Sequence, residues 1–186
     1  MVILVKVCLI GDGGVGKTTL RNNYIGKGFD IEYLPTLGTD FVTKEVEIST
    51  GKMKKILNFQ IWDIAGQPTF KQIRRIYYRK AVGCLVVFDI TRTKSLYNLE
   101  KWIEELIQHS GSPKIAVIIL GNKIDLRDVS PNWISTESAE QYINELELKF
   151  PDLKRILYLE TSAKTGVNVN RAFSELGQRI LEIFNP

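Results

Sequence analysis

The sequence predicts an α/β fold in which a mostly parallel sheet lies between two layers of helices. Apolar runs of strand length alternate along the chain with segments whose apolar residues recur at helical spacing. This alternation is typical of parallel sheets covered on both faces. The stretches richest in glycine and polar residues each follow a predicted strand, which is where ligands bind in such folds. The 186 residues suit a single domain spanning residues 1–186.

Six segments have the apolar content and length of strands: 2–10, 41–48, 56–62, 82–89, 115–121 and 156–160. The second and third alternate between apolar and polar residues, as half-buried strands do. The Ser-Thr-Gly-Lys stretch at 49–52 between them is typical of a hairpin turn. This pair is therefore expected to be antiparallel, in a sheet that is otherwise parallel.

Helices are expected between and after the strands, at about 17–25, around Arg74 and Arg75, and at 95–108, 137–150 and 168–184. In the segment 95–108, five apolar residues fall on one helical face, and the segment 168–184 shows the same pattern. The predicted architecture is a three-layer fold, a six-stranded mostly parallel sheet flanked by about five helices.

Composition excludes several classes of function. The net charge of +4 is too modest and too dispersed to indicate nucleic-acid binding. Cys8 and Cys84 lie inside apolar runs without a CxxC neighbour or a nearby histidine, so they predict two buried free thiols in a reducing compartment rather than a metal site. No apolar segment is long enough to span a membrane, and the chain opens on a strand rather than a signal peptide. A cytoplasmic protein is expected.

A phosphate loop is predicted at residues 11–18, which read Gly-Asp-Gly-Gly-Val-Gly-Lys-Thr between a strand and a helix. Its glycines let backbone N–H groups point at phosphate oxygens, and the helix adds its positive end. Lys17 is expected to reach the β- and γ-phosphates, and the Thr18 hydroxyl to bind Mg²⁺. The expected phosphate-binding residues are Gly11, Asp12, Gly13, Gly14, Val15, Gly16, Lys17, Thr18 and Thr19.

Two later motifs indicate that the base is guanine. Asp125, in the Asn-Lys-Ile-Asp stretch after an apolar strand, can accept hydrogen bonds from guanine N1–H and its exocyclic amine, a donor pair that adenine lacks. The Lys123 stem can cover one face of the base. After the next strand, a backbone N–H of Thr161-Ser162-Ala163-Lys164 can read guanine O6. The expected base-binding residues are Asn122, Lys123, Asp125, Ser162, Ala163 and Lys164.

The Trp-Asp-Ile-Ala-Gly-Gln stretch at 62–67 ends another strand and predicts the hydrolytic side of the site. Asp63 is expected to hold Mg²⁺ with Thr18 and Thr36, and Gly66 allows a backbone N–H to approach the γ-phosphate. Gln67 is the residue expected to orient the attacking water, with Lys17 as the second catalytic residue. Tyr33, three residues before Thr36, is expected to fold over the phosphates.

These five motifs, GDGGVGKT, YLPT, WDIAGQ, NKID and TSAK, resemble in this order the Ras superfamily of small GTPases over essentially the whole chain. The stretches LGTDF at 37–41, YYRKA at 77–81 and FDIT at 88–91 are most similar to the Rab branch. The resemblance implies the small G-protein version of the P-loop NTPase fold. It also implies a switch that binds GTP or GDP with Mg²⁺, hydrolyses GTP slowly and recruits effectors in the GTP state, in membrane trafficking or signalling.

The resemblance further implies that Phe29 contacts the guanine edge and that Thr36 and Gly66 sense the γ-phosphate. It implies an effector-facing aromatic cluster at Phe41, Trp62 and Tyr77, for which plain core packing is an equal alternative. Partners are expected to be an exchange factor, a GTPase-activating protein and effectors, acting on a monomer, with peripheral membrane association undecided.

Four departures from the family pattern remain, one of which is a hairpin around 49–54 that looks a few residues long. Pro68 follows Gln67 where Rab proteins usually carry Glu, and the region 128–157 looks extended. The sequence ends at Pro186 without a cysteine to prenylate, so the anchor is expected to be absent from this chain or unused.

Two alternative functions remain, a GTP-dependent binding module without hydrolysis and a P-loop kinase. No Arg or Lys occurs from 28 to 41, and Arg74 and Arg75 are expected to point away, so an activating partner is expected to supply an arginine.

Overall fold

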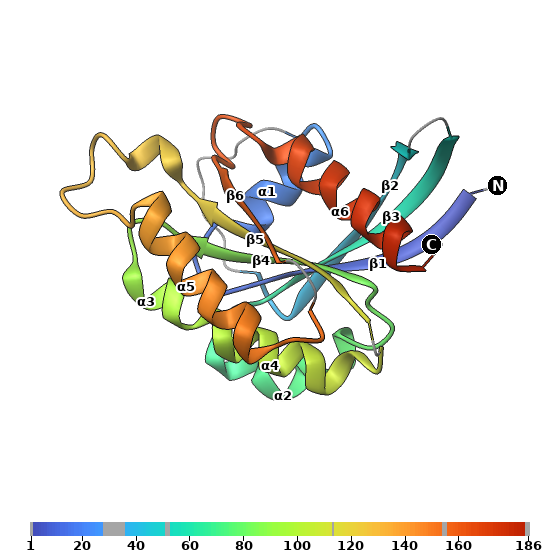
Figure 1. The fold of residues 1–186 in the computed structure, drawn as a ribbon, viewed down its shortest axis with the longest axis horizontal. Coiled ribbons are helices and arrows are strands. Elements are labelled where there is room, and N and C mark those ends of the chain that lie inside the picture. The colour runs from blue at the N-terminus through green and yellow to red at the C-terminus, as the bar shows by residue number, and fades with distance from the viewer. Residues whose placement is uncertain (1, 28–35, 51–52, 113, 154–155, 185–186) are drawn as a thin grey trace.

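One six-stranded sheet, in the order β2-β3-β1-β4-β5-β6, organises the computed structural model of the chain (Figure 1). The structure describes residues 2–27, 36–50, 53–112, 114–153 and 156–184. The strands are β1 (Val2–Ile10), β2 (Thr39–Thr50), β3 (Met53–Ile64), β4 (Gly83–Asp89), β5 (Ala116–Asn122) and β6 (Leu157–Thr161). Every neighbouring pair is parallel except β2 and β3, as the sequence predicts.

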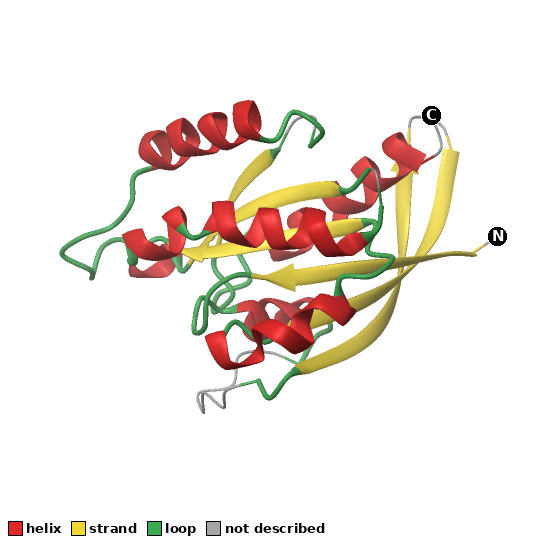
Figure 2. Ribbon diagram, turned by 90° about the horizontal axis from the view of Figure 1, so that it is seen from below, coloured by secondary structure: helices red, strands yellow, loops and turns green. Residues whose placement is uncertain are grey.

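The helices cover both faces of this sheet. They are α1 (Lys17–Tyr24), α2 (Lys71–Tyr77), α3 (Thr93–Tyr97), α4 (Leu99–Ser110), α5 (Thr136–Lys149) and α6 (Val169–Phe184), with 3₁₀ turns η1 (Pro68–Phe70) and η2 (Ile124–Leu126). In Figure 1, α1 and α6 lie on one side of the sheet and α2 to α5 on the other. Figure 2 views the sheet from the side that carries α2, α4 and α5. The predicted three-layer α/β class is confirmed.

Each face of the sheet has its own hydrophobic core. On the α1 and α6 face, Tyr24 and Phe59 pack against Phe173, whose ring stacks on Tyr24 at a centroid distance of 3.7 Å. On the opposite face, Phe88 and Ile103 belong to the core beneath α2 to α5. Strands β4 and β5 are buried along their whole length, because side chains on both of their faces meet a helical layer.

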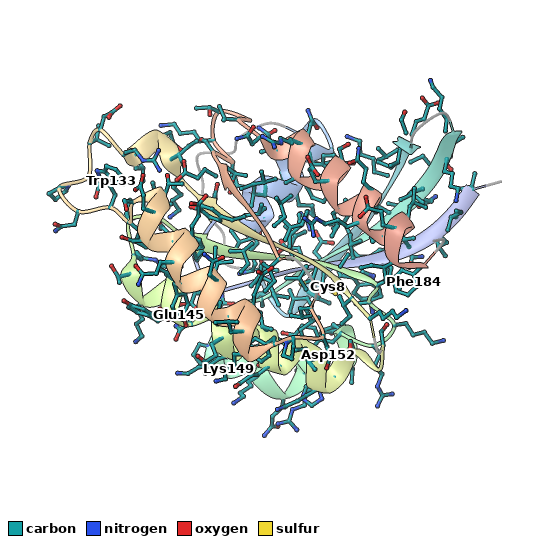
Figure 3. The ribbon with its side chains drawn as sticks, in the orientation of Figure 1. Cys8, Trp133, Glu145, Lys149, Asp152 and Phe184 are labelled. Atoms are coloured by element: carbon teal, nitrogen blue, oxygen red, sulfur yellow. The ribbon has the colours of Figure 1, made fainter. Side chains whose placement is uncertain are left out.

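Both cysteines lie in the second core. Cys8 and Cys84 are free, fully buried and side by side in the register of β1 and β4. Figure 3 shows Cys8 in the interior, whereas Trp133 lies on a projecting loop. The prediction of two buried free thiols is confirmed.

The β2–β3 hairpin and the helix expected at 95–108 differ most from the sequence-based boundaries. Strands β2 and β3 extend beyond 41–48 and 56–62, because their antiparallel pairing continues from Thr39 opposite Ile64 to Thr50 opposite Met53. The helix expected at 95–108 is divided into α3 and α4 at Asn98, whose side chain donates a hydrogen bond to Asp12 Oδ2 at 2.8 Å.

Strand β1 lies at the centre of the sheet, with β3 on one side and β4 on the other. After β1 the chain forms β2 and β3 on one side of it, and it then crosses to β4 on the other side. This reversal of strand order creates the crevice where such folds bind ligands. The phosphate loop follows β1 directly. The fold thus places residues 11–18 at this crevice.

Candidate nucleotide-binding and hydrolytic site

The phosphate loop wraps tightly because glycine occupies its most crowded positions. A Cβ at Gly11 would lie 2.1 Å from the carbonyl oxygen of Val87, and one at Gly16 would lie 2.3 Å from Asn122 Nδ2. Both glycines have positive φ angles, 136° and 101°. A larger residue at either position would push the loop away from β4 or from the loop after β5.

Lys17 lies inside this loop, with only 6% of its surface exposed. Its Nζ donates to the carbonyl oxygens of Gly11 at 2.7 Å and Asp12 at 2.9 Å. Burial lowers the pKa of Lys17 to about 8, and the negative charge of Asp63 partly opposes that shift. A buried ammonium group held by neutral carbonyl oxygens is well suited to neutralise an anionic ligand.

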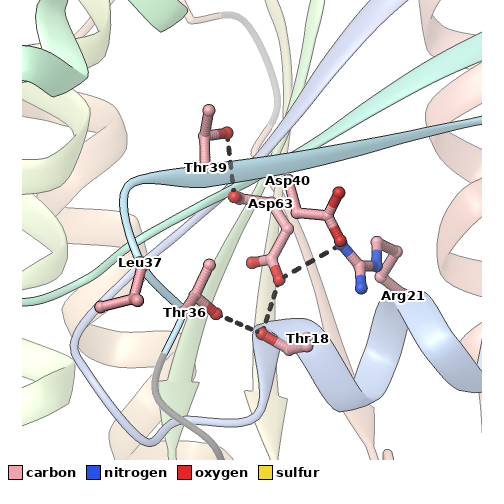
Figure 4. Close-up of a pocket in the computed structure, with 7 residues that line it drawn as sticks. All are labelled: Thr18, Arg21, Thr36, Leu37, Thr39, Asp40 and Asp63. Carbon is pink, nitrogen blue, oxygen red and sulfur yellow. Dashed lines mark hydrogen bonds and ion pairs between the residues drawn. The ribbon is translucent and has the colours of Figure 1, made fainter.

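Three oxygens from three separate segments meet beside the loop (Figure 4). Thr18 Oγ1 donates to Asp63 Oδ2 at 2.5 Å and lies 2.9 Å from Thr36 Oγ1. Within the described part of the chain, Asp63 Oδ1 is buried without a hydrogen-bond partner. Burial raises the pKa of Asp63, and the hydrogen bond from Thr18 with the positive charges of Lys17 and Arg21 only partly opposes that shift. These hard oxygen ligands fit Mg²⁺, which takes few protein ligands and completes its shell with water and phosphate.

Arg21 and Asp40 also line this pocket, and sequence reasoning missed both. The pocket measures about 220 Å³. Arg21 Nη1 is 2.6 Å from Asp40 Oδ2 and 3.8 Å from Asp63 Oδ2, although the Arg21 side chain is only 6% exposed. The position of Arg21 on α1, one helical turn after Lys17, is the only signal that the sequence offered. The ion pair ties the start of β2 to the proposed metal-binding end of the site.

Gly66 and Gln67 follow β3 and press against the phosphate loop. A Cβ at Gly66 would lie 2.4 Å from the Gly11 carbonyl oxygen and 2.5 Å from the Gly13 nitrogen. Gln67 has the extended backbone, with φ −69° and ψ 142°, that a following proline favours, and Pro68 opens η1. Its Oε1 is buried without a protein partner among the described residues. The structure thus leaves one hydrogen-bond acceptor of Gln67 without a described partner beside the phosphate loop.

Helix α4 anchors the segment after Gln67, a connection that sequence reasoning did not foresee. Arg74 pairs with Glu105 at 3.0 Å and donates to the Gln67 carbonyl oxygen at 3.0 Å. The Arg74 guanidinium also stacks on the Trp102 ring at 4.4 Å, and Trp102 Nε1 donates to Asp12 Oδ1 at 2.8 Å. The phosphate loop and the Gln67 segment are thus joined through one helix.

The loops after β5 and β6 form the base-binding end. Asn122 is fully buried and joins three segments: Nδ2 donates to the Val15 carbonyl at 2.8 Å, and Oδ1 accepts from Ala163 N at 3.0 Å and Thr161 Oγ1 at 3.2 Å. Asp125 is oriented by Ser162, whose Oγ donates to Asp125 Oδ1 at 2.5 Å. The structure therefore brings together motifs that lie more than a hundred residues apart in the sequence.

Lys123 and the loop after β6 complete this end of the site. Lys123 has a left-handed backbone, with φ 71°, and its Nζ contacts Asp89 Oδ2 at 2.7 Å. The N–H groups of Ser162 and Ala163 donate within the protein, to the Val167 carbonyl and to Asn122. Among the described hydrogen bonds, none uses the N–H of Lys164.

Sequence comparison identifies the family to which this site belongs. Residues 6–182 match the Ras family. The chain belongs to the Ras family of small GTPases. It is similar to the GTP-binding protein YPTC5 of Chlamydomonas reinhardtii, with 38% identity over 98% of this chain and 88% of the relative. It is also similar to Ras-related protein Rab-22A of Homo sapiens (37% identity, 94% and 82%) and to Ras-related protein Rab7 of Drosophila melanogaster (38%, 97% and 82%).

This small GTPase is Rab-like, binds guanine nucleotide and hydrolyses GTP, and its family works through protein regulators and effectors. Two of its expected site residues, Phe29 and Tyr33, lie outside the described residues. No described helix is long and apolar enough to cross a membrane.

The aromatic residues expected to face effectors form one continuous cluster in this GTPase. Phe41 stacks on Trp62 at a centroid distance of 5.2 Å, and Trp62 contacts Tyr77 at 5.8 Å. Phe41 is 54% exposed, whereas Trp62 and Tyr77 are half-buried. The cluster thus packs against the sheet through Trp62 and exposes Phe41 to solvent, and contact with effectors stays a prediction.

Proposed function

We propose that this GTPase is a Mg²⁺-dependent switch of the Rab type that acts in membrane trafficking. In the GTP state it recruits effectors, and slow hydrolysis returns it to the GDP state. Residues 1–186 form a single G domain that works as a monomer in the cytoplasm and at the surface of a membrane. An exchange factor and a GTPase-activating protein set its state.

The observation that carries this proposal is the convergence of Thr18, Thr36 and Asp63 beside the phosphate loop. These residues would hold Mg²⁺, which would supply positive charge to the phosphates of the bound nucleotide. Thr36 belongs to a different segment from the phosphate loop, so its position can depend on whether the γ-phosphate is present. That dependence is what a switch requires.

The remaining residues have roles that follow from their contacts. Lys17 neutralises the phosphates, and the backbone N–H groups of the phosphate loop bind their oxygens. Gln67 orients the attacking water through its unsatisfied Oε1. Asp125 reads the two guanine donors, and the N–H of Lys164 is the group available for guanine O6. Phe29 and Tyr33 would close over the base and the phosphates.

The test is the nucleotide preference of Asp125→Asn. The substitution removes two charge-assisted hydrogen bonds and places an amide N–H group against a guanine donor. GTP affinity should therefore fall by about 3 kcal/mol, or roughly 100-fold. Xanthosine triphosphate should be gained, because its carbonyl complements the new amide. Competition against a fluorescent GDP measures both, and Asp128→Asn, at an exposed residue nearby, is the control. An unchanged preference for GTP in Asp125→Asn would remove Asp125 from the base site.

A further inference from the structure

Arg92, just after β4, lies against the phosphate loop. Its Nη2 donates to the carbonyl oxygen of Gly13 at 3.0 Å, across 79 positions of sequence. A Cβ at Gly14 would lie 4.0 Å from Arg92 Nη1. The guanidinium therefore lies beside the two glycines in the middle of the loop.

Contacts with Asp89 and Ser95 hold the segment that carries Arg92 in place. Arg92 Nε lies 3.6 Å from Asp89 Oδ2, and the Arg92 backbone N–H donates to the Asp89 carbonyl oxygen at 2.9 Å. Ser95 Oγ donates to the Arg92 carbonyl oxygen at 2.6 Å. An arginine held in this way loses less conformational entropy when its outer nitrogens bind a ligand.

The charge of Arg92 is only partly compensated. The Asp89 carboxylate that it approaches is shared with Lys123, and the Gly13 carbonyl is neutral. The Arg92 side chain is 44% exposed, so its outer nitrogens can exchange one acceptor for another.

Gln67 and the preceding Gly66 also lie close to Gly13. A Cβ at Gly13 would lie 3.9 Å from Gln67 Cγ, and one at the preceding Gly66 would lie 2.5 Å from Gly13 N. Gly13 thus has both Arg92 and the Gln67 segment as close neighbours. By contrast, Arg74 is occupied by Glu105 and by the Gln67 carbonyl oxygen.

We propose that Arg92 is an arginine supplied by the chain itself, which moves from the Gly13 carbonyl to phosphate oxygens of bound GTP and stabilises the transition state of hydrolysis. This assignment replaces the sequence-based expectation that an activating partner supplies the arginine. In that reaction, a water oxygen bonds to the γ-phosphorus and the bond to the bridging oxygen breaks. The electron pair of that bond stays on GDP, and both protons of the water leave with inorganic phosphate, one on the former water oxygen and one on a phosphate oxygen. Arg92 gives up no atoms and gains none. It supplies positive charge where negative charge develops on the phosphate oxygens in the transition state. The inference rests on the proposed function of the site.

Two assays, both without any partner protein, test this proposal. The first measures single-turnover hydrolysis of bound GTP. The second measures binding of tetrafluoroaluminate, which mimics the transferring phosphoryl group, to the GDP-bound protein. Arg92→Ala should lower the hydrolysis rate by at least about 10-fold; for comparison, the arginine finger that an activator supplies to Ras contributes roughly 10³–10⁵. The wild-type chain should form the GDP–tetrafluoroaluminate complex alone, and Arg92→Ala should not. Arg92→Lys should recover part of both signals, since it keeps the charge but loses the planar fork. Lys94→Ala, at an exposed neighbour, is the matched control.

GDP affinity, measured on the same variants, separates the possible outcomes. If Arg92→Ala binds GDP within about threefold of wild type while hydrolysis and tetrafluoroaluminate uptake fall, the assignment holds. If GDP affinity falls as much as the rate, Arg92 only braces the phosphate loop and the inference is wrong. It is equally wrong if the variant hydrolyses GTP at the wild-type rate. Failure of the wild-type chain to bind GTP would instead overturn the proposed function.

Discussion

At the scale of single residues, Asn122 links the two ends of the site. Its fully buried side-chain amide donates to the Val15 carbonyl in the phosphate loop. It also accepts from Thr161 at the end of β6 and from Ala163 just after it. An isolated Asn-Lys-x-Asp motif suggests contact with the base alone. The geometry adds that Asn122 keeps the base-binding loop in register with the phosphate loop.

Replacing Asn122 should therefore destabilise the protein. Asn122→Ala leaves three buried polar groups without a partner, which should lower the free energy of unfolding by about 2–4 kcal/mol and Tm by about 5–15 °C. Thermal unfolding with excess GDP measures the change. Asn132→Ala, at an exposed asparagine, should leave Tm within about 1 °C. Equal Tm values for the two variants would contradict the linking role.

The two buried thiols give a prediction with a definite pH dependence. Burial raises the pKa of Cys8 from 9.0 to about 12 and raises that of Cys84 well above its usual range. Neither thiol should react with Ellman's reagent at pH 8 until the chain unfolds. The unfolded chain releases these protons near pH 9, whereas the folded chain retains them, so stability should fall as pH rises from about 9 towards 12.

Denaturant unfolding at several pH values measures that fall. Cys8→Ala should reduce the slope of stability against pH above 9, since it removes one of the retained protons. Rapid labelling of either thiol in the folded, nucleotide-bound protein would show that the second core opens far more readily than its packing implies.

At the scale of elements, α4 holds both α2 and the phosphate loop. Arg74 on α2 meets Glu105 on α4, and Trp102 on α4 meets Asp12 in the loop. Helix α2 has seven residues, only one of which is buried, so its own packing is slight. Its position depends on Arg74 more than on apolar contacts.

Removing Arg74 should loosen the Gln67 segment. Arg74→Met leaves the mostly buried Glu105 unpaired and should cost about 2–4 kcal/mol of stability. Hydrolysis should fall more than GDP affinity, because Gln67 loses a backbone anchor while the phosphate loop keeps its contacts. Denaturant unfolding and single-turnover hydrolysis measure the two effects. Arg75→Met, at the adjacent exposed arginine, should change neither. Adding Glu105→Gln to Arg74→Met should restore part of the stability, and an additive loss would argue against the pair.

At the scale of the whole molecule, the bound nucleotide and Mg²⁺ should contribute directly to stability. The site joins segments after β1, β3, β5 and β6, so a ligand there binds only the folded chain. If Mg²⁺ tightens GDP binding about 100-fold, removing it costs about 2.7 kcal/mol, or roughly 5–11 °C in Tm. Adding EDTA to the GDP complex should produce this shift.

The Thr18 hydroxyl should carry much of that effect. Thr18→Asn should shrink the EDTA-induced shift in Tm and leave a protein that prefers GDP over GTP, since the γ-phosphate relies more on the shared ion. Thr43→Asn, at an exposed position on β2, should retain the full shift. An unchanged shift in Thr18→Asn would place the ion elsewhere.

The sequence by itself determined the class of fold and the guanine-nucleotide chemistry. Apolar runs such as those of β4 and β5 predict buried parallel strands, since both faces of each must meet a helix. The phosphate loop and the Asn-Lys-Ile-Asp motif are contiguous, so their backbone geometry is largely local. Their placement at strand ends predicts that they meet at one edge of the sheet, and the bonds from Asn122 to Val15 and Ala163 realise that expectation.

Only the tertiary structure decided the partners of the charged residues around this site. Arg92 reaches Gly13 across 79 positions, and Trp102 reaches Asp12 across 90. In the sequence these residues look like ordinary helix-surface charges and core aromatics, because neither spacing nor periodicity specifies which distant chain segment a side chain meets. The path of the chain over the sheet sets that neighbour. The pairing of β2 with β3 likewise lengthens both strands past the end of their alternating pattern, because each hydrogen bond in the ladder is supplied by the other strand.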